Sequence, residues 1–174
     1  FRSRDQGGWR VAGYQADLED GPNWTGCLYE QDGRGVMVGR GEDARFTSAG
    51  KTSTRFADAT ELLGRVKRGE WNRYVVRARG RVLETEINGV RMFRCVDDDE
   101  ARAGRRGILA FQLHQGAPMT VRFRAIELTE LAPAPDARSS ADASPKPRTE
   151  RVPQWLWPHP DARQDEVAAF RRAF

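Results

Sequence analysis

The sequence predicts an all-β domain of the sandwich or jelly-roll type. Apolar and polar residues alternate with a period of two in several short segments between residues 9 and 131. Glycines and an Asn-Gly pair separate these segments, as turns between strands require. No helical segments alternate with them, which argues against a parallel sheet built from strand–helix–strand units. We therefore expect about eight antiparallel strands packed in two layers.

Each expected strand is an alternating run bounded by turn residues. In chain order the strands are 9–19, 26–30, 35–40, 72–79, 82–87, 91–96, 107–114 and 119–131. The Asn88-Gly89 pair between two such runs is a strong signal for a two-residue hairpin. A second turn is expected at 79–81. Residues 59–67 have apolar side chains at helical spacing, which predicts a short helical turn.

A change of composition divides the chain after residue 131. Residues 132–153 contain five of the nine prolines and almost no large apolar side chain. Such a segment cannot bury enough surface to offset the entropy lost on ordering, so we interpret it as a disordered linker. The main domain is then 1–131, and 154–174 is a tail in which aromatic residues return. The tail either docks on the main body or begins a second module.

Charge and cysteine content exclude several classes of protein. The net charge is +4, but the 29 basic and 25 acidic residues are mixed along the chain, unlike the basic patch of a nucleic-acid-binding protein. No apolar run approaches the roughly 20 residues of a membrane-spanning helix. Cys27 and Cys95 lack the spacing of a zinc site, so they form either one disulfide or two buried thiols. The acidic run 97–100 is best explained as a solvated turn, so no metal site is predicted.

Alternation also sorts polar residues onto shared strand faces. The pairs are Gln15 with Asp17, Gln112 with His114, and Arg122 with Arg124. If these strands lie in one sheet, its outer face presents amide, carboxylate, imidazole and guanidinium groups together, as in a carbohydrate-binding cleft. The alternative is that they are the wet face of an ordinary half-exposed sheet.

A series of short motifs resembles a known family over residues 1–131. The motifs are Phe1-Arg2, Gly13-Tyr14-Gln15-Ala16-Asp17, Thr25-Gly26-Cys27-Leu28-Tyr29-Glu30, Gly33-Arg34-Gly35, Trp71-Asn72, Ile87-Asn88-Gly89, Gln112-Leu113-His114 and Val121-Arg122-Phe123-Arg124. Their order and spacing resemble the 3-keto-disaccharide hydrolase domain, which occurs in bacteria that degrade glycans. The resemblance implies a concanavalin-like jelly roll that is secreted or periplasmic and is covalently linked to further domains.

The chain departs from the family pattern in two places. Family domains begin with further strands before the Phe-Arg element, so we expect this sandwich to be incomplete at its N-terminus. Ala125 follows Arg124, where the family often has Asn or Asp. The tail motif at 155–157, with Phe170-Arg171, resembles the opening of a β-sandwich module found beside such domains.

The resemblance implies cleavage of a glycosidic bond in a 3-keto sugar by elimination and hydration, without naming a cofactor. The alternative is a non-catalytic carbohydrate-binding module. Elimination needs a base near C2, a donor for the enolate oxygen and an acid for the leaving group. The candidate catalytic residues are Asp17 as the base, Glu30 as a rival base, His114 as acid or base, and Arg124 at the enolate oxygen.

Substrate binding is assigned to a second set of residues. They are Arg2, Gln15, Trp24, Tyr29, Trp71, Gln112 and Arg122. The three aromatic residues among them would stack on sugar rings and the two glutamines would hold hydroxyls. Structural roles remain open: Asp17 could instead pair with an arginine, and Tyr29 and Trp71 could instead lie in the core.

Overall fold

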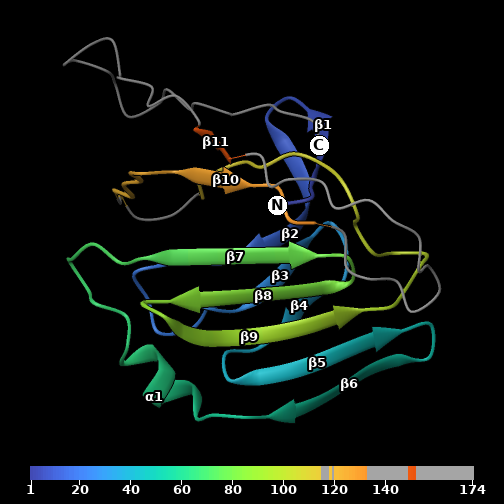
Figure 1. Cartoon of the computed structure of the whole chain (residues 1–174), viewed down its shortest axis with the longest axis horizontal. Helices are drawn as coiled ribbons and strands as arrows, with labels where there is room; N and C mark the ends of the chain where they lie inside the picture. Colours follow the sequence, from blue (N-terminus) through green and yellow to red (C-terminus); the bar gives the residue numbers. More distant parts are fainter. Residues whose placement is uncertain (115–117, 119, 133–148, 152–174) are drawn as a thin grey trace. The chain divides into compact units, whose positions relative to one another are not determined.

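The computed structural model describes residues 1–114, 118, 120–132 and 149–151 (Figure 1). They belong to two compact units, one formed by Phe1–Ala110 and one that begins at Phe111. The predicted tail 154–174 and nearly all of the predicted linker lie outside the described residues. No helix in the described part is long and apolar enough to cross a membrane.

The first unit is a sandwich of two sheets (Figure 1). A four-stranded antiparallel sheet has the order β1-β2-β3-β4, with β1 Arg4–Gly7, β2 Arg10–Ala16, β3 Leu28–Gln31 and β4 Gly35–Val38. A five-stranded sheet has the order β6-β5-β9-β8-β7, with β5 Glu42–Thr47, β6 Gly50–Arg55, β7 Tyr74–Arg79, β8 Val82–Ile87 and β9 Val90–Asp97. Only the β5–β9 pair is parallel. The predicted all-β jelly-roll sandwich is thus confirmed.

The predicted turns and the short helix are also confirmed. Ile87 pairs with Val90 across Asn88-Gly89, and both turn residues have positive φ, 53° and 79°. Gly80, with φ 55°, joins β7 to β8 in the same compact way. The helix α1 is Ala59–Leu63, and the Asp58 side chain caps it by accepting hydrogen bonds from two backbone N–H groups.

Two predicted strands near the end of the domain are mostly wrong. Within 107–114, only Ile108 forms an isolated bridge, to Ser3. Within 119–131, only β10, Glu127–Thr129, is a strand, and it pairs with β11, Thr149–Arg151, inside the predicted linker. An alternating run becomes a strand only when a neighbour takes up its backbone hydrogen bonds. In the described residues, strand pairing in these two runs is limited to Ile108 and to β10, and Leu113 and Phe123 remain exposed.

Four strands of the described structure are not predicted by the sequence pattern: β1, β5, β6 and β11. β6 lies at the edge of its sheet, every residue in it is exposed, and it contains no apolar residue that would alternate. β5 buries only Ala44 and Phe46 between charged residues. Strands with so little burial, whether at the edge like β6 or inside the sheet like β5, carry almost no hydrophobic period, so only the backbone pairing in the structure identifies them.

The core fills the space between the two sheets. The buried residues of the main cluster are Tyr14, Leu28, Met37, Val38, Ala44, Phe46, Leu83, Phe93 and Cys95. A smaller cluster joins Leu62 of α1 to Ile87 and Met92, with Tyr74 packed against it. Cys27 and Cys95 are both buried and free, so of the two alternatives the structure has two buried thiols and no disulfide between these residues.

A buried polar network ties the two sheets together at the end of the sandwich that includes Gly80, called here the Gly80 end. Arg34, in the β3–β4 turn, makes two hydrogen bonds to Asp97 of β9, at 2.6 and 3.0 Å. Its Nε lies 2.5 Å from the Glu30 carboxylate. The Tyr14 hydroxyl donates to Asp97 and accepts from the backbone N–H of Gly104.

The network sets the charge state of its members. Burial alone would raise the pKa of Asp97, but hydrogen bonds from Arg34 and Tyr14 hold it below the usual range. The pKa of Tyr14 is raised, first by burial and then by its hydrogen bond to Asp97. Asp97 is fully buried and the side chains of Arg34 and Glu30 are about nine-tenths buried, so solvent barely screens these charges.

We predict that Arg34→Met destabilises the domain by about 3–5 kcal/mol, because it leaves two buried carboxylates without their cation. Arg45→Met is the matched control: Arg45 also pairs with an aspartate, but its side chain is 59% exposed. The control should cost less than about 1 kcal/mol. Urea unfolding monitored by fluorescence measures both values. Equal costs for the two variants would contradict the role given to the network.

Candidate functional site

The loops around α1 gather at one end of the sandwich, opposite the Gly80 end (Figure 1). This α1 end consists of the β2–β3 loop, the β4–β5 turn, α1 with the chain that leads into β7, and the Asn88-Gly89 turn. The Tyr74 hydroxyl of β7 donates to the backbone carbonyl of Asp17, at 3.0 Å. That hydrogen bond connects the two sheets at this end.

A buried arginine fixes the β2–β3 loop, residues 17–27. Arg40 of the β4–β5 turn donates to the backbone carbonyls of Pro22 and Thr25 in the loop and of Ala59 in α1. Gly26 has φ +79°, and a Cβ there would lie 3.0 Å from Met92 Cγ. The loop is therefore packed against both α1 and the smaller core cluster.

Glu19 organises the same loop from within. One of its carboxylate oxygens accepts hydrogen bonds from the backbone N–H groups of Asn23 and Trp24, at 2.6 and 2.7 Å. The Thr25 hydroxyl closes the loop by accepting from Glu19 N and donating to Glu19 O, at 2.9 and 2.8 Å. The loop so formed holds Trp24 with 44% of its surface exposed.

Asp17 lies where β2 meets this loop. Its backbone N–H donates to Cys27 O and its carbonyl accepts from Gly26 N, so the residue continues the β2–β3 ladder. Within the described residues, no hydrogen bond or ion pair reaches its carboxyl group, so the alternative of an arginine partner is not found there. Desolvation, with a smaller contribution from the charge of Glu19, raises the pKa of Asp17 to about 6. A carboxyl with such a pKa is ionised at neutral pH and is more basic than an ordinary aspartate.

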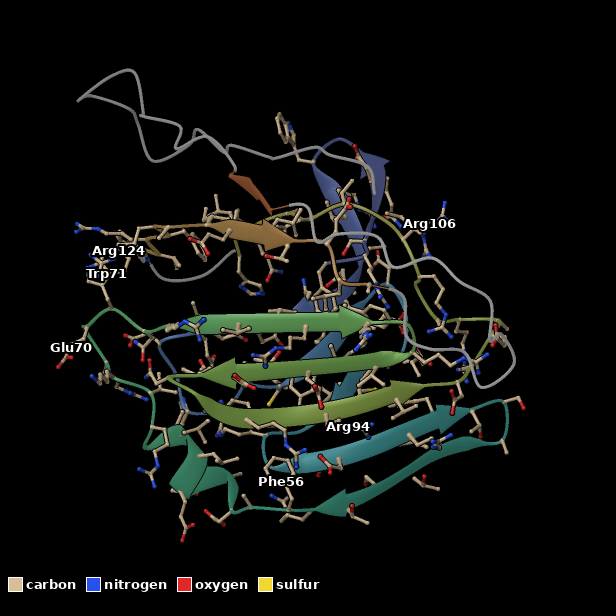
Figure 2. The ribbon with its side chains drawn as sticks, viewed as in Figure 1. Phe56, Glu70, Trp71, Arg94, Arg106 and Arg124 are labelled. Carbon is tan, nitrogen blue, oxygen red and sulfur yellow. The ribbon has the colours of Figure 1, made fainter. Side chains whose placement is uncertain are left out.

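Trp71 lies in the chain that leads into β7, at the same end (Figure 2). The neighbouring Asn72 side chain accepts from Lys67 N and from the Asn88 amide, each at 2.8 Å. Asn88 also donates to Arg65 O and accepts from Arg73 N. The two asparagines thus lock this segment onto the β8–β9 hairpin, with Trp71 47% exposed beside them.

The outer face of the four-stranded sheet carries two more of the predicted residues. Gln15 and Tyr29 are directly opposite each other in the β2–β3 register, so their side chains share a face. Both are partly buried. Tyr29 is therefore on the sheet surface and outside the main core cluster.

Two predicted residues are engaged in structural contacts near the Gly80 end. Glu30 is 8% exposed and holds Arg34, so it is not a free carboxylate and is the weaker candidate for a base. Arg2 donates to the backbone carbonyls of Ala78 and Gly80, at 2.8 and 2.7 Å. These contacts connect the N-terminal segment to the end of β7.

The remaining predicted residues lie in the second unit. Gln112, His114, Arg122 and Arg124 are all exposed. The Phe111 and Phe123 rings pack against each other, with 4.3 Å between their centroids, and bring their two segments together. Because these residues belong to a separate unit, their grouping with Asp17 stays a prediction.

Sequence reasoning did not single out Glu19, Arg40 or Tyr74, which organise the α1 end. Their contacts go to backbone groups, so no residue-type pattern in the sequence announces them. The acidic run 97–100 is neutralised by arginines, which pair with all four of its carboxylates. In the described residues, no group of three or more His, Cys, Asp or Glu side chains is placed to hold a metal ion.

Comparison with known proteins identifies the family. The model of the 3-keto-alpha-glucoside-1,2-lyase-like domain matches residues 1–129, which include the whole sandwich and the α1 end. No significant match was found among curated proteins or among solved structures. The match covers well over half of the chain, and the fold agrees with the resemblance found in the sequence motifs. The chain belongs to the 3-keto-alpha-glucoside-1,2-lyase-like domain family.

Proposed function

We propose that this domain cleaves the glycosidic bond of 3-keto-glucosides by elimination, with Asp17 as the base. The observation that carries the proposal is the carboxyl of Asp17, which is partly desolvated, receives no hydrogen bond in the described structure and has a pKa near 6. A base is most effective when its pKa lies close to the working pH. The family match supplies the substrate class.

The reaction follows from the chemistry of the ketone. A carbonyl at C3 acidifies the proton on C2, and the Asp17 carboxylate removes that proton to leave an enolate. The enolate electrons then form a C1–C2 double bond and expel the substituent on C1, which takes up a proton. This first stage is a lyase reaction; water then adds across the double bond and completes a net hydrolysis. We assign the proton for the leaving group to His114 and the enolate oxygen to Arg124, in keeping with the sequence motifs.

Substrate binding is proposed for the aromatic side chains at the α1 end. Trp24 and Trp71 are each nearly half exposed. The Glu19 carboxylate accepts a hydrogen bond from Trp24 N. The Asn72 amide donates to the carbonyl of Glu70, next to Trp71. Indole faces stack on the apolar faces of sugar rings. The same two residues favour the second candidate function, a carbohydrate-binding module without catalysis, which would need these platforms but no base.

We also propose that the domain acts outside the cytoplasm as part of a larger protein, as the family resemblance implies. Fractionation of cells that express the full-length protein tests this. Recovery of the protein only in the cytoplasmic fraction would refute the proposal.

Asp17→Asn should lower the rate of turnover about 10²–10⁴-fold while leaving carbohydrate binding intact. Loss of a general base costs typically 10²–10⁴-fold in rate, and the amide keeps the shape of the side chain. The assay is release of nitrophenol from a nitrophenyl 3-keto-α-glucoside, and calorimetry with the same ligand measures binding. Asp20→Asn, an exposed aspartate of the same loop, is the matched control and should keep full activity.

The outcomes of this assay separate the two candidate functions. Turnover by the wild type that is strongly lowered only in Asp17→Asn supports the enzyme. Binding by the wild type without any turnover supports the binding module. Wild-type activity retained in Asp17→Asn would remove Asp17 from the mechanism.

The raised pKa of Asp17 also predicts how stability depends on pH. A carboxyl whose pKa is higher in the folded than in the unfolded state makes the native state less stable as pH rises from about 4 to about 6, because the native state then loses a favoured proton. Asp17→Asn removes this penalty. We expect it to raise the free energy of unfolding by about 1 kcal/mol at pH 7, a value reduced for solvent screening, and by almost nothing at pH 4. Urea unfolding at both pH values is the measurement; an equal effect at both would refute the assigned cause.

A further inference from the structure

We propose that Glu19 is a positioning residue of the α1 end, whose carboxylate holds the β2–β3 loop so that Asp17 and Trp24 are presented to the substrate together. This inference rests on the proposed function of Asp17. In the proposed reaction, Glu19 itself contacts no reacting atom. Its action is through the loop backbone and through its charge.

The contacts of Glu19 are those of a clamp. A single oxygen, Oε1, accepts from two successive backbone N–H groups, Asn23 and Trp24, which a loop of this kind would otherwise leave to water. Gly21 leaves room for the carboxylate: a Cβ at that position would lie 2.9 Å from Glu19 Cδ. The loop has therefore closed around the side chain of Glu19.

The clamp joins the two parts of the candidate site. Toward β2, Glu19 is two residues from Asp17, whose position is fixed by the ladder to Gly26 and Cys27. Toward the loop tip, the bond to Trp24 N sets the backbone from which the exposed indole projects. Loss of these two hydrogen bonds should therefore let Trp24 move relative to Asp17.

The charge of Glu19 adds a second effect on the same base. The titratable and charged groups around Asp17 are Glu19 on its own loop, Tyr74 on β7, Cys27 on β3, and Arg40, whose guanidinium binds the loop carbonyls beside Cys27. Glu19 is the one that raises the pKa of Asp17, after desolvation. A negative neighbour makes the base harder to ionise and stronger once ionised.

Two variants separate the clamp from the charge. Glu19→Gln keeps an oxygen that can accept both N–H bonds but removes the charge, so the loop should stay intact and the pKa of Asp17 should fall. Glu19→Ala removes both, so Trp24 should lose its fixed position. Asp58→Asn is the matched control, because the Asp58 carboxylate also accepts two backbone N–H groups, at the start of α1. The control should leave Asp17 and Trp24 unchanged.

The experiment combines nuclear magnetic resonance with kinetics on the full chain. The carboxyl carbon of Asp17, assigned with Asp17→Asn, is titrated in each variant, and amide exchange is followed at Asn23 and Trp24. In Glu19→Gln the midpoint of Asp17 and the ascending limb of the pH–activity profile should both move to lower pH. In Glu19→Ala the two amides should lose protection, and kcat/KM should fall about tenfold or more, mostly through KM.

Each result has a definite meaning. An unchanged titration in Glu19→Gln, or unchanged protection in Glu19→Ala, would overturn the proposal. If Glu19→Ala fails to fold, the titration in Glu19→Gln still decides. If the wild type shows no turnover while both resonance effects appear, the positioning role stands and the proposed reaction fails. If turnover is present but both variants keep the wild-type KM and pH profile, the reaction stands and the positioning role fails.

Discussion

The sandwich depends on one buried interaction, the pairing of Arg34 with Asp97. Arg34 belongs to the four-stranded sheet and Asp97 to the five-stranded sheet, so their two hydrogen bonds fix the separation and register of the layers at the Gly80 end. The surrounding groups complete the arrangement: Glu30 accepts a hydrogen bond from the guanidinium Nε, Tyr14 donates its hydroxyl to Asp97, and the guanidinium lies 5.0 Å from the centre of the Phe46 ring. A cation at this place can leave only by exposing two carboxylates to an apolar core, which is why the network constrains so much of the fold.

This assembly shows one use of arginine in a chain that is rich in it but has only a modest net charge. Arg34 and Arg40 are buried and satisfied by opposite means, the first by two carboxylates and the second by three backbone carbonyls. A planar guanidinium with five donors can bridge several acceptors at once, whereas a lysine ammonium cannot match that geometry. On the outer face of the five-stranded sheet, Arg94 pairs with Glu84 of the adjacent strand (Figure 2). These three arginines therefore act within the sandwich, as bridges between its own groups.

The central strands could be predicted from sequence because burial imposes a period on them. In β8, Leu83, Thr85 and Ile87 point into the core and alternate with glutamates, so 82–87 was predicted with its exact bounds. β6 has no such period, since it buries nothing. In the candidate site, too, a residue that continues a strand with a clear period could be predicted from the sequence, and the contacts made in turns and loops could not. Asp17 was found because the alternating pattern places it on the same face as Gln15. The contacts of Glu30 and Glu19 are local but depend on the conformation of a turn and a loop, and the contact of Arg34 with Asp97 joins residues 63 apart, so no period in the sequence encodes them.

Two aspartates of the same fold lie in opposite environments, one suited to a structural role and one to the catalytic role that we propose. Asp97 receives hydrogen bonds from Arg34 and Tyr14, and these overcome its burial and keep it ionised. Asp17 also has a tyrosine beside it, but the Tyr74 hydroxyl donates to the backbone carbonyl of Asp17, and among the described residues no donor reaches the carboxyl group. Desolvation then acts on Asp17 unopposed, and the negative charge of Glu19 adds to it. A carboxylate stabilised by several donors is a poor base, and one denied them is a good base. The direction in which one hydroxyl points thus separates the structural aspartate from the candidate catalytic one.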